Sequence, residues 1–328
     1  MKFNFYDRED ILDFVSKREG EIKFGEEVAL VQSFEEIKDR NAEFVIFGIP
    51  EDIGVRANYG KPGTSTAWNF FLTAFLNIQK NGFNSPQNTI LLGEIDCGEL
   101  MNKAASLNLE DEKNLPKLGL LVSELDVYVA EIVEQIHSGG KTPIIIGGGH
   151  NNAYGNIRGL SKSLGKPVNI LNIDAHTDLR NTDYRHSGNG FSYAKKEGFL
   201  KKYAVFGLHI NYTPEYIFEM QNNSDEYLFD LFENMISLSR VEKTQRFQRS
   251  MDFLEASFGL EIDCDAIEKM QSSAMTPSGF LLDDIRAFLQ IAKKETPFYL
   301  HLCEASAQQS PMTGKALSYL VSDFIRKS

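Results

Sequence analysis

The sequence is poor in cysteine and has no long apolar run. Its three cysteines, Cys97, Cys264 and Cys303, lie far apart, are odd in number and lack CxxC spacing, which argues against both a disulfide framework and a thiolate zinc site. No stretch of about 18 consecutive apolar residues occurs, and the N-terminal residues are charged and interrupted, so neither a membrane-spanning helix nor a signal peptide is expected. We therefore expect a soluble, cytoplasmic protein.

Positive charge is scarce as well. The chain has 34 Lys and Arg residues against 46 Asp and Glu residues, so its formal net charge is −12. A surface of this sign does not attract nucleic acid, whose phosphates are bound by basic side chains that release counterions. We expect a small-molecule partner, and neither nucleic acid nor membrane.

The apolar residues, which are 42% of the 328, fall in short β-branched and aliphatic runs between helix-like stretches. This alternation predicts a single-domain, three-layer α/β/α fold with a mainly parallel sheet of about eight strands. The clearest helix covers residues 120–137, where apolar residues recur at spacings of three and four and two glycines follow. The candidate strands are residues 44–49, 89–92, 143–146, 168–173, 203–208, 235–238, 258–262 and 298–303.

No repeat, low-complexity tract or long Gly/Ser linker divides the chain. We therefore predict one domain over residues 41–328. Residues 1–40 are more polar, and we expect them to form a surface segment that wraps around the domain or a neighbouring subunit.

Polar residues collect directly after several of the predicted strands. In an open α/β sheet the ligand lies outside the carboxyl ends of the strands, so these positions are the candidates for function. Residues 143–146 are followed by GGGH, whose glycines let the backbone turn tightly before the histidine. Residues 168–173 are followed by DAHTD, in which alternation can point three side chains the same way. The candidates are His150, Asp174, His176, Asp178, Asp263, Asp265 and Glu304.

The histidines and aspartates in this set are the ligand types that suit Mn²⁺ and related divalent ions. Without cations the carboxylates would repel: at an effective dielectric of about 20, two of them roughly 4 Å apart repel by about 4 kcal/mol. One divalent ion rarely needs four carboxylates, so the set predicts two ions that share ligands. Taken singly, each Asp could instead be a helix N-cap or turn residue, and His150 a structural histidine.

These motifs resemble those of the ureohydrolase superfamily, the arginases, agmatinases and formimidoylglutamases, which use two manganese ions. The superfamily pattern is GG-x-H, D-A-H-x-D, D-x-D and a late Glu, and the likeness covers residues 44 to about 312. It implies an arginase-like fold, and Glu304 as the carboxylate that meets the amidine or guanidine nitrogen of the substrate. The ligands implied for one ion are His150, Asp174, Asp178 and Asp263. Those implied for the second are His176, Asp174, Asp263 and Asp265, with Asp174 and Asp263 shared.

Within the superfamily, three segments are most similar to formimidoylglutamases: GGGH followed by AYG, DAHTDLR, and EDIGVRANYGKPGT. The substrate of that branch, N-formimino-L-glutamate, carries two carboxylates, which guanidinium groups bind bidentately. Arg56 and Arg180 are therefore the candidate substrate-binding arginines. The alternative for each is an ion pair within the protein.

The loop after DAHTD departs from the arginase pattern. Arginases have a proton-shuttling histidine just beyond Ser-Gly-Asn, where this chain has Phe191, so arginase is disfavoured. Asn189 of the retained Ser-Gly-Asn is a candidate substrate contact. His186 resembles the loop histidine of agmatinases, displaced by one residue, and is a candidate general acid. Asn151 and Asn189 also replace the Glu and Thr more usual in formimidoylglutamases, which leaves the substrate open.

The resemblance implies a binuclear Mn²⁺ hydrolase acting on a linear amidine. The leading hypothesis is cleavage of N-formimino-L-glutamate to L-glutamate and formamide, a step of histidine degradation, with Asp178 relaying a proton to the leaving nitrogen and Glu304 stabilising the cationic nitrogen. One alternative is an agmatinase or other guanidino-compound ureohydrolase that releases urea. Another is a non-catalytic metal-binding relative. Because family members assemble as trimers or hexamers, a homo-oligomer is expected.

Overall fold

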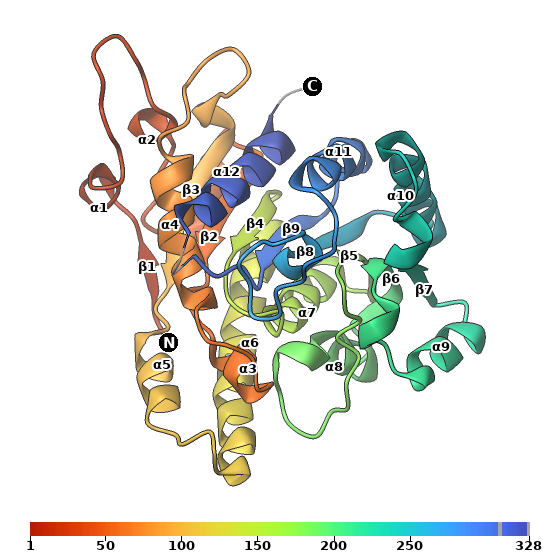
Figure 1. The fold of residues 1–328 in the computed structure, drawn as a ribbon. Coiled ribbons are helices and arrows are strands. Elements are labelled where there is room, and N and C mark those ends of the chain that lie inside the picture. The colour runs from red at the N-terminus through yellow and green to blue at the C-terminus, as the bar shows by residue number, and fades with distance from the viewer. Residues whose placement is uncertain (308–309, 327–328) are drawn as a thin grey trace.

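A nine-stranded sheet forms the middle layer of the molecule (Figure 1). The computed structural model describes residues 1–307 and 310–326. The strand order is β1-β3-β2-β4-β9-β8-β5-β6-β7; β1 pairs antiparallel with β3, and the other pairs are parallel. The strands are β1 Phe3–Phe5, β2 Phe44–Gly48, β3 Thr89–Ile95, β4 Thr142–Ile146, β5 Val168–Ile173, β6 Leu200–Leu208, β7 Tyr227–Leu231, β8 Phe258–Asp263 and β9 Tyr299–Cys303.

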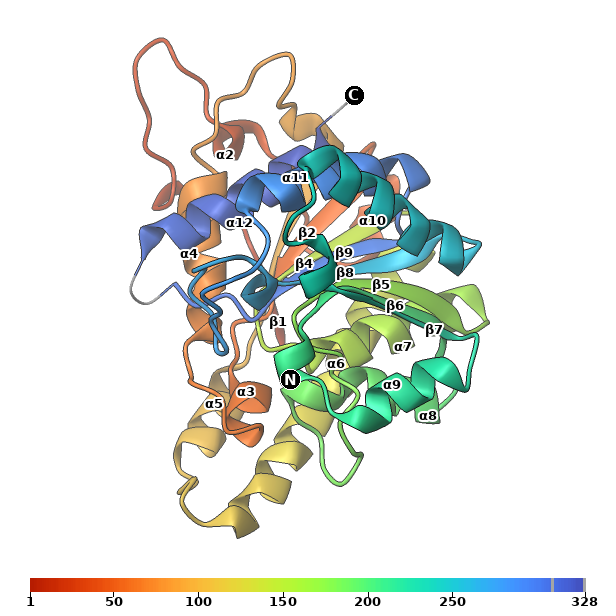
Figure 2. The same cartoon turned by 45° about the vertical axis from the view of Figure 1, so that its right-hand side comes forward.

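Helices cover both faces of the sheet, as the rotated view makes clear (Figure 2). Helices α4, α10, α11 and α12 share one apolar cluster with one face, and α6, α7, α8 and α9 share a second cluster with the other. The predicted three-layer α/β/α class is therefore confirmed. The helices are α1 Arg8–Leu12, α2 Phe24–Glu27, α3 Ile53–Ala57, α4 Ala67–Phe75, α5 Gly98–Ala105, α6 Leu115–Ser138, α7 Asn152–Leu164, α8 Gly190–Lys196, α9 Glu215–Asn222, α10 Arg240–Leu254, α11 Leu282–Ala292 and α12 Pro311–Ile325.

The central strands are continuous apolar runs because both of their faces are buried. In β4, Ile144 and Ile146 belong to one apolar cluster and Ile145 to the other, and all three are fully buried. At about 25 cal/mol per Å² of apolar surface, burying each such side chain stabilises the fold by roughly 1.5–3 kcal/mol. The two-sided core thus fixes the central strands, whose carboxyl ends carry the candidate residues.

The longest helix confirms its predicted position. The expected helix over residues 120–137 is the body of α6, which begins at Leu115 with a proline in its first turn and ends before Gly139 and Gly140. Proline is favoured in a first turn, where its missing N–H would have no partner in the helix. Among the described residues, no helix combines the length and apolar composition that crossing a membrane requires.

The first forty residues, expected to form a surface segment, also contribute to the sheet and to the apolar core. β1 extends the sheet by pairing with β3, and the side chains of Ile11, Phe24 and Val28 are fully buried in one of the two apolar clusters. The three-residue strand FNF is too short to give a recognisable alternation, which is why the sequence did not predict it. The expected boundary at residue 41 stays a prediction.

The prediction of a strand over residues 235–238 is wrong. Met235 ends a 3₁₀-helix, and Ile236 beyond it is 63% exposed. The strand at this edge is β7, whose sequence YLFDL has an acidic residue at a buried position. Asp230 is tolerated there because its Oδ1 accepts a hydrogen bond from Nε of Arg246 at 2.7 Å. Arg246 belongs to α10, so the apolar and polar pattern of the strand sequence alone could not indicate this partner.

Candidate metal centre

The four neighbouring strands β4, β9, β8 and β5 end at the same edge of the sheet, and their carboxyl ends bring the candidate residues together. His150 follows β4, Glu304 follows β9, Asp265 lies just beyond β8, and Asp174 is the first residue after β5. These segments are far apart in sequence, but the parallel pairing of β4 with β9, β9 with β8 and β8 with β5 makes them neighbours. The sheet topology therefore builds one site from four segments that are distant in sequence.

One group of side chains converges on the Nδ1 atom of His150. That atom lies 2.9 Å from Oδ2 of Asp178, 3.2 Å from Oδ2 of Asp174 and 3.3 Å from Oδ2 of Asp263. The ring is buried, yet neither of its nitrogens makes a hydrogen bond to the described residues. Such a convergence of ligand atoms on a common point is the arrangement that a divalent cation requires.

A second group adjoins the first and shares Asp174 with it. It consists of Asp174, His176 and Asp265, and the Nδ1 atom of His176 lies 3.0 Å from Oδ2 of Asp265. Oδ1 of Asp265 is buried without a hydrogen-bond partner among the described residues. The expectation that Asp263 is also shared stays a prediction, because its Oδ1 accepts the N–H of Asp265 at 2.8 Å.

Unusual backbone conformations hold these side chains in place. Asp178 and Glu304 have φ values of 49° and 58°, in the left-handed region that side-chain-bearing residues rarely adopt. Gly148 has φ 72°, and a Cβ there would lie 2.2 Å from Nδ2 of Asn152, so this position accepts glycine only. Strained residues of this kind concentrate at functional sites.

The electrostatics of the cluster favour a bound cation. Burial, together with the charges of Asp265 and Asp174, raises the pKa of Asp263 well above its usual range. Burial alone would lower the pKa of His176, but the carboxylates of Asp265 and Asp174 raise it to about 12. Positive charge therefore stabilises the crowded carboxylates, and the raised pKa values of Asp263 and His176 show that these two groups hold protons in the absence of a metal. The unpartnered Nδ1 of His150, the unpartnered Oδ1 of Asp265 and the nitrogen-and-oxygen donor set all fit divalent metal ions.

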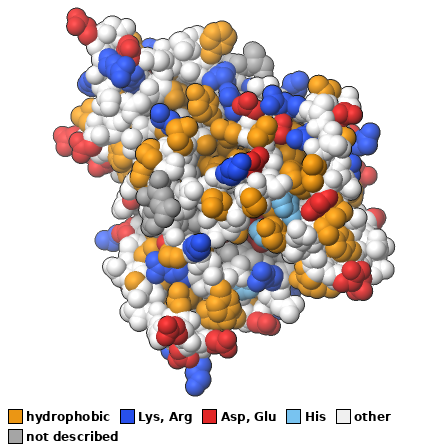
Figure 3. Space-filling view, in the orientation of Figure 1, with side chains coloured by type: hydrophobic (Ala, Val, Ile, Leu, Met, Phe, Trp, Pro, Cys, Tyr) orange, Lys and Arg blue, Asp and Glu red, His pale blue; other side chains and the backbone are white. Residues whose placement is uncertain are grey.

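A cavity of about 410 Å³ opens onto this cluster. On the face that the space-filling view presents, histidine side chains come to the surface among hydrophobic ones (Figure 3). The lining includes four of the candidate ligands and Glu304, together with Arg180 and several uncharged polar residues. Its lining residues are Asn58, Tyr59, Gly60, His176, Thr177, Asp178, Arg180, Ser187, Tyr212, Pro214, Tyr216, Asp263, Asp265, Ser273, Ala274 and Glu304.

Glu304 stands in the wall of this cavity. Its Oε1 accepts the backbone N–H of His150 at 2.8 Å, and its Oε2 accepts the hydroxyl of Ser273. Burial, with the charge of Asp178 adding to it, raises the pKa of Glu304 to about 7. Glu304 therefore lies in the cavity wall beside the cluster, and its expected pairing with a cationic nitrogen of the substrate stays a prediction.

The described residues that line the cavity do not include Arg56, His186 or Asn189. Arg56 turns to Asp52, with Nε and Oδ1 2.6 Å apart. The amide of Asn189 is used entirely within its own loop, where its oxygen accepts from Arg185 and its nitrogen donates to two backbone carbonyls. These internal partners do not favour the expected substrate contacts of Arg56 and Asn189, which stay predictions.

The role of general acid expected for His186 also stays a prediction, and its surroundings do not favour it. Its Nδ1 accepts the backbone N–H of Gly188, and burial together with the guanidinium groups of Arg180 and Arg185 lowers its pKa to about 4. At neutral pH the ring is uncharged and lacks the second proton that a general acid would transfer. The sequence could not reveal this because the burial of the ring and the approach of Arg180 depend on the folding of the loop.

Several cavity residues were not predicted from the sequence. Tyr212 stacks on the ring of His176, with centroids 5.1 Å apart and an interplanar angle of 24°. Asn58 accepts a hydrogen bond from Arg180 and donates one to Ser187. Tyr212 follows the carboxyl end of β6, where functional residues are expected, but a tyrosine at such a position carries no metal-ligand signal.

Comparison with known proteins places these motifs in a family. The model of the Arginase family matches residues 42–325. Formimidoylglutamase of Macrococcus caseolyticus is 27% identical over 66% of this chain, but only 62% of that relative is covered, and formimidoylglutamase of a Geobacillus species is 28% identical over 80% of this chain and 76% of its own length. The crystal structure of Trypanosoma cruzi formiminoglutamase with Mn²⁺ has the same fold, with a TM-score of 0.72 at 16% identity, over 93% of this chain and 97% of that one. The chain belongs to the arginase family.

Proposed function

We propose that this protein is a manganese-dependent hydrolase that cleaves a C–N bond of a linear amidine, and that its substrate is N-formimino-L-glutamate, hydrolysed to L-glutamate and formamide. The observation that carries the proposal is the buried convergence of His150, Asp174, Asp178 and Asp263 beside the Asp174, His176 and Asp265 group. The formimidoylglutamase relatives and the Mn²⁺ of the Trypanosoma cruzi structure support the metal and the reaction class. Both candidate substrates considered below are consistent with membership of the arginase family.

The proposed ligands are the two histidines and four aspartates, and we propose two ions per chain. When bound, divalent ions polarise a C=N group and lower the pKa of water. Asp174 belongs to both groups and so would be a ligand in each. Bound cations would also offset the repulsion among the buried carboxylates of the two groups.

The remaining roles fall to residues in the cavity wall. Glu304, anchored by the N–H of His150, would pair with the amidine nitrogen and orient the C–N bond toward the cluster. Asp178, whose carboxylate lines the cavity, would carry a proton toward the leaving nitrogen. Arg180 would bind a carboxylate at the other end of the substrate through its guanidinium fork.

A guanidino compound is a second candidate substrate, and one observation favours it. Arg180 is the only Lys or Arg side chain among the described residues that line the cavity, while N-formimino-L-glutamate brings two carboxylates. A substrate with one carboxylate, such as guanidinobutyrate, would leave no negative charge without a basic partner. Such an enzyme would release urea.

A product assay separates these possibilities. The purified chain is loaded with Mn²⁺ and incubated separately with N-formimino-L-glutamate, agmatine, arginine and guanidinobutyrate. We expect formamide and L-glutamate from the first substrate and no urea from the others. Release of urea from a guanidino compound would identify that compound as the substrate, with the same class of reaction. Binding of Mn²⁺ without formation of any product would favour a non-catalytic metal-binding relative. The homo-oligomer and the cytoplasmic location stay predictions.

A further inference from the structure

A second row of buried polar side chains lies directly beneath the candidate ligands. Asn172, Glu261 and His301 are register partners on β5, β8 and β9, and all three are fully buried. Asn172 precedes Asp174 by two residues and Glu261 precedes Asp263 by two. Since side chains two apart in a strand lie on the same face, this row faces the same way as the ligands.

Glu261 is the centre of this row. Its Oε1 accepts the hydroxyl of Tyr299 at 2.6 Å and the amide of Asn156 at 3.4 Å, while its Oε2 faces Nδ1 of His301 at 2.5 Å. A buried carboxylate costs several kcal/mol in lost hydration, and such bonds only offset that cost. An apolar residue would suit the middle of a buried strand better, so the fold alone gives no reason for a glutamate here.

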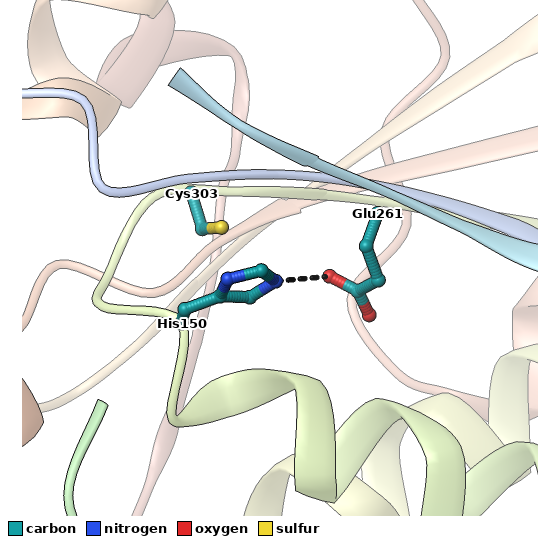
Figure 4. Close-up of side chains that lie close together, drawn as sticks. All are labelled: His150, Glu261 and Cys303. Carbon is teal, nitrogen blue, oxygen red and sulfur yellow. Dashed lines mark ion pairs between the residues drawn. The ribbon is translucent and has the colours of Figure 1, made fainter. Parts of the chain in front are cut away.

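The Glu261 carboxylate also faces the imidazole of His150. Nε2 of His150 lies 3.6 Å from Oε2 of Glu261 and points toward it (Figure 4). The opposite ring nitrogen, Nδ1, faces the carboxylates of Asp174, Asp178 and Asp263. A carboxylate beside one imidazole nitrogen favours the proton on that nitrogen and leaves the lone pair of the other free for a metal.

The same network reaches the loop that carries the histidine. Nε2 of His301 lies 3.4 Å from the carbonyl oxygen of Gly147, the first of the three glycines before His150. Asn172 also donates to Oδ2 of Asp174 at 2.8 Å, so the row contacts two of the candidate ligands. The contacts therefore bear on both the orientation of the imidazole and the position of its loop.

We propose that Glu261 is a positioning residue of the metal centre, which keeps the proton of His150 on Nε2 and turns Nδ1 toward the metal, while His301 and Tyr299 hold its own carboxylate in place. The inference rests on the proposed function, because it needs the histidine and aspartate cluster to bind metal. Glu261 is not among the described residues that line the cavity, so it acts through His150 and not on the substrate.

The test is the Mn²⁺ affinity of Glu261→Gln in the full chain, measured by the electron paramagnetic resonance signal of free Mn²⁺ during titration. Glutamine keeps the size of the side chain but removes its charge, and we expect affinity to fall roughly 10- to 100-fold, as is typical for the partners of metal-binding histidines. Asp284→Asn is the matched control, because this buried carboxylate on α11 pairs with Arg240 and Lys243 and belongs to neither ligand group. The control should bind Mn²⁺ as the wild type does.

The Tm of the metal-free proteins reports the purely structural cost of each substitution. A lower Tm with unchanged Mn²⁺ affinity in Glu261→Gln would overturn the inference. If that variant does not fold, Tyr299→Phe decides: this change removes the 2.6 Å bond to Oε1, and we expect weaker Mn²⁺ binding, whereas unchanged affinity would overturn the inference. Absence of Mn²⁺ binding by the wild type would instead contradict the proposed function, so the two failures are distinguishable.

Discussion

Both ends of the parallel sheet have a cavity, and the two cavities are of similar size. The one at the carboxyl ends measures about 410 Å³ and the one at the amino ends about 470 Å³. The first is lined by Asp178, Asp263, Asp265 and Glu304. The second is lined by the basic residues Lys141, Lys293, Lys294 and Arg326. The two cavities therefore differ little in volume, but they differ in the sign of the charged side chains that predominate in their walls.

The two cavities differ further in how their polar atoms are satisfied. At the amino ends, Nζ of Lys293 donates to the carbonyls of Asp323 and Arg326, and Nζ of Lys141 donates to that of Arg40. At the carboxyl ends, buried atoms of His150 and Asp265 make no hydrogen bond to the described residues. Buried atoms without partners are costly unless a ligand completes them. Buried ligand atoms without hydrogen-bond partners, more than cavity volume, therefore distinguish the carboxyl ends of the sheet as the candidate site.

The largest expected effect comes from removing a ligand at the carboxyl end. In Asp263→Asn, the first group keeps its shape but loses a charged oxygen 3.3 Å from Nδ1 of His150. We expect Mn²⁺ content and turnover to be lost together, by more than the roughly 100-fold typical of a partner outside the ligand shell. Metal analysis and formamide release measure the two.

The matched change at the amino end is Lys294→Ala, which removes a charge from the other cavity. We expect Mn²⁺ content and formamide release to equal those of the wild type. If Lys294→Ala reduces turnover as strongly as Asp263→Asn, the assignment of function to the carboxyl ends fails.

A smaller effect is expected for Glu304→Gln. The amide oxygen can still accept the N–H of His150, which now binds Oε1 at 2.8 Å, so the backbone should stay in place. The lost charge should reduce kcat roughly 100- to 1000-fold, as other preorganised electrostatic contacts do, while Mn²⁺ affinity changes little. Equal losses of metal and activity would instead make Glu304 part of the metal centre.

The two arginines give a more moderate contrast. Arg180→Lys keeps the charge in the cavity but loses the guanidinium fork, so we expect KM to rise about 10-fold, since weakening a charged hydrogen bond costs on the order of 1.5 kcal/mol. Arg56→Lys should leave KM unchanged, because Arg56 is paired with Asp52 outside the cavity lining. Steady-state kinetics with N-formimino-L-glutamate measure both variants, and a larger KM change in Arg56→Lys would restore the original prediction for that residue.

The smallest effect concerns stability against pH. The pKa of His186 is lowered from 6.5 to about 4 in the folded protein, so below pH 6.5 the unfolded chain takes up a proton that the folded chain does not. This contribution to stability is present above pH 6.5 and is lost as the pH falls toward 4. His186→Asn should therefore flatten the fall of Tm between pH 6.5 and 4. An unchanged slope would mean that His186 titrates normally when folded.

The sequence predicted what depends on alternation and on strand ends. The class of fold, the two-sided core around residues such as Ile145, and the meeting of the 150, 174–178 and 263–265 motifs all follow from parallel pairing of apolar strands. It did not predict the partners of loop residues. Asn189 and Arg56 were expected at the substrate, but each is engaged by a side chain whose position depends on loop conformation. Glu261 was concealed within an apolar run, because only strand register reveals its neighbours.

The central claim, that two divalent ions bind among six side chains at the carboxyl ends of β4, β5 and β8, is tested most directly by metal stoichiometry. The full chain is loaded with Mn²⁺, freed of unbound metal by gel filtration, and analysed by mass spectrometry for manganese and protein. We predict about two Mn²⁺ ions per chain. One ion per chain would contradict the shared arrangement around Asp174, and none would contradict the metal centre altogether.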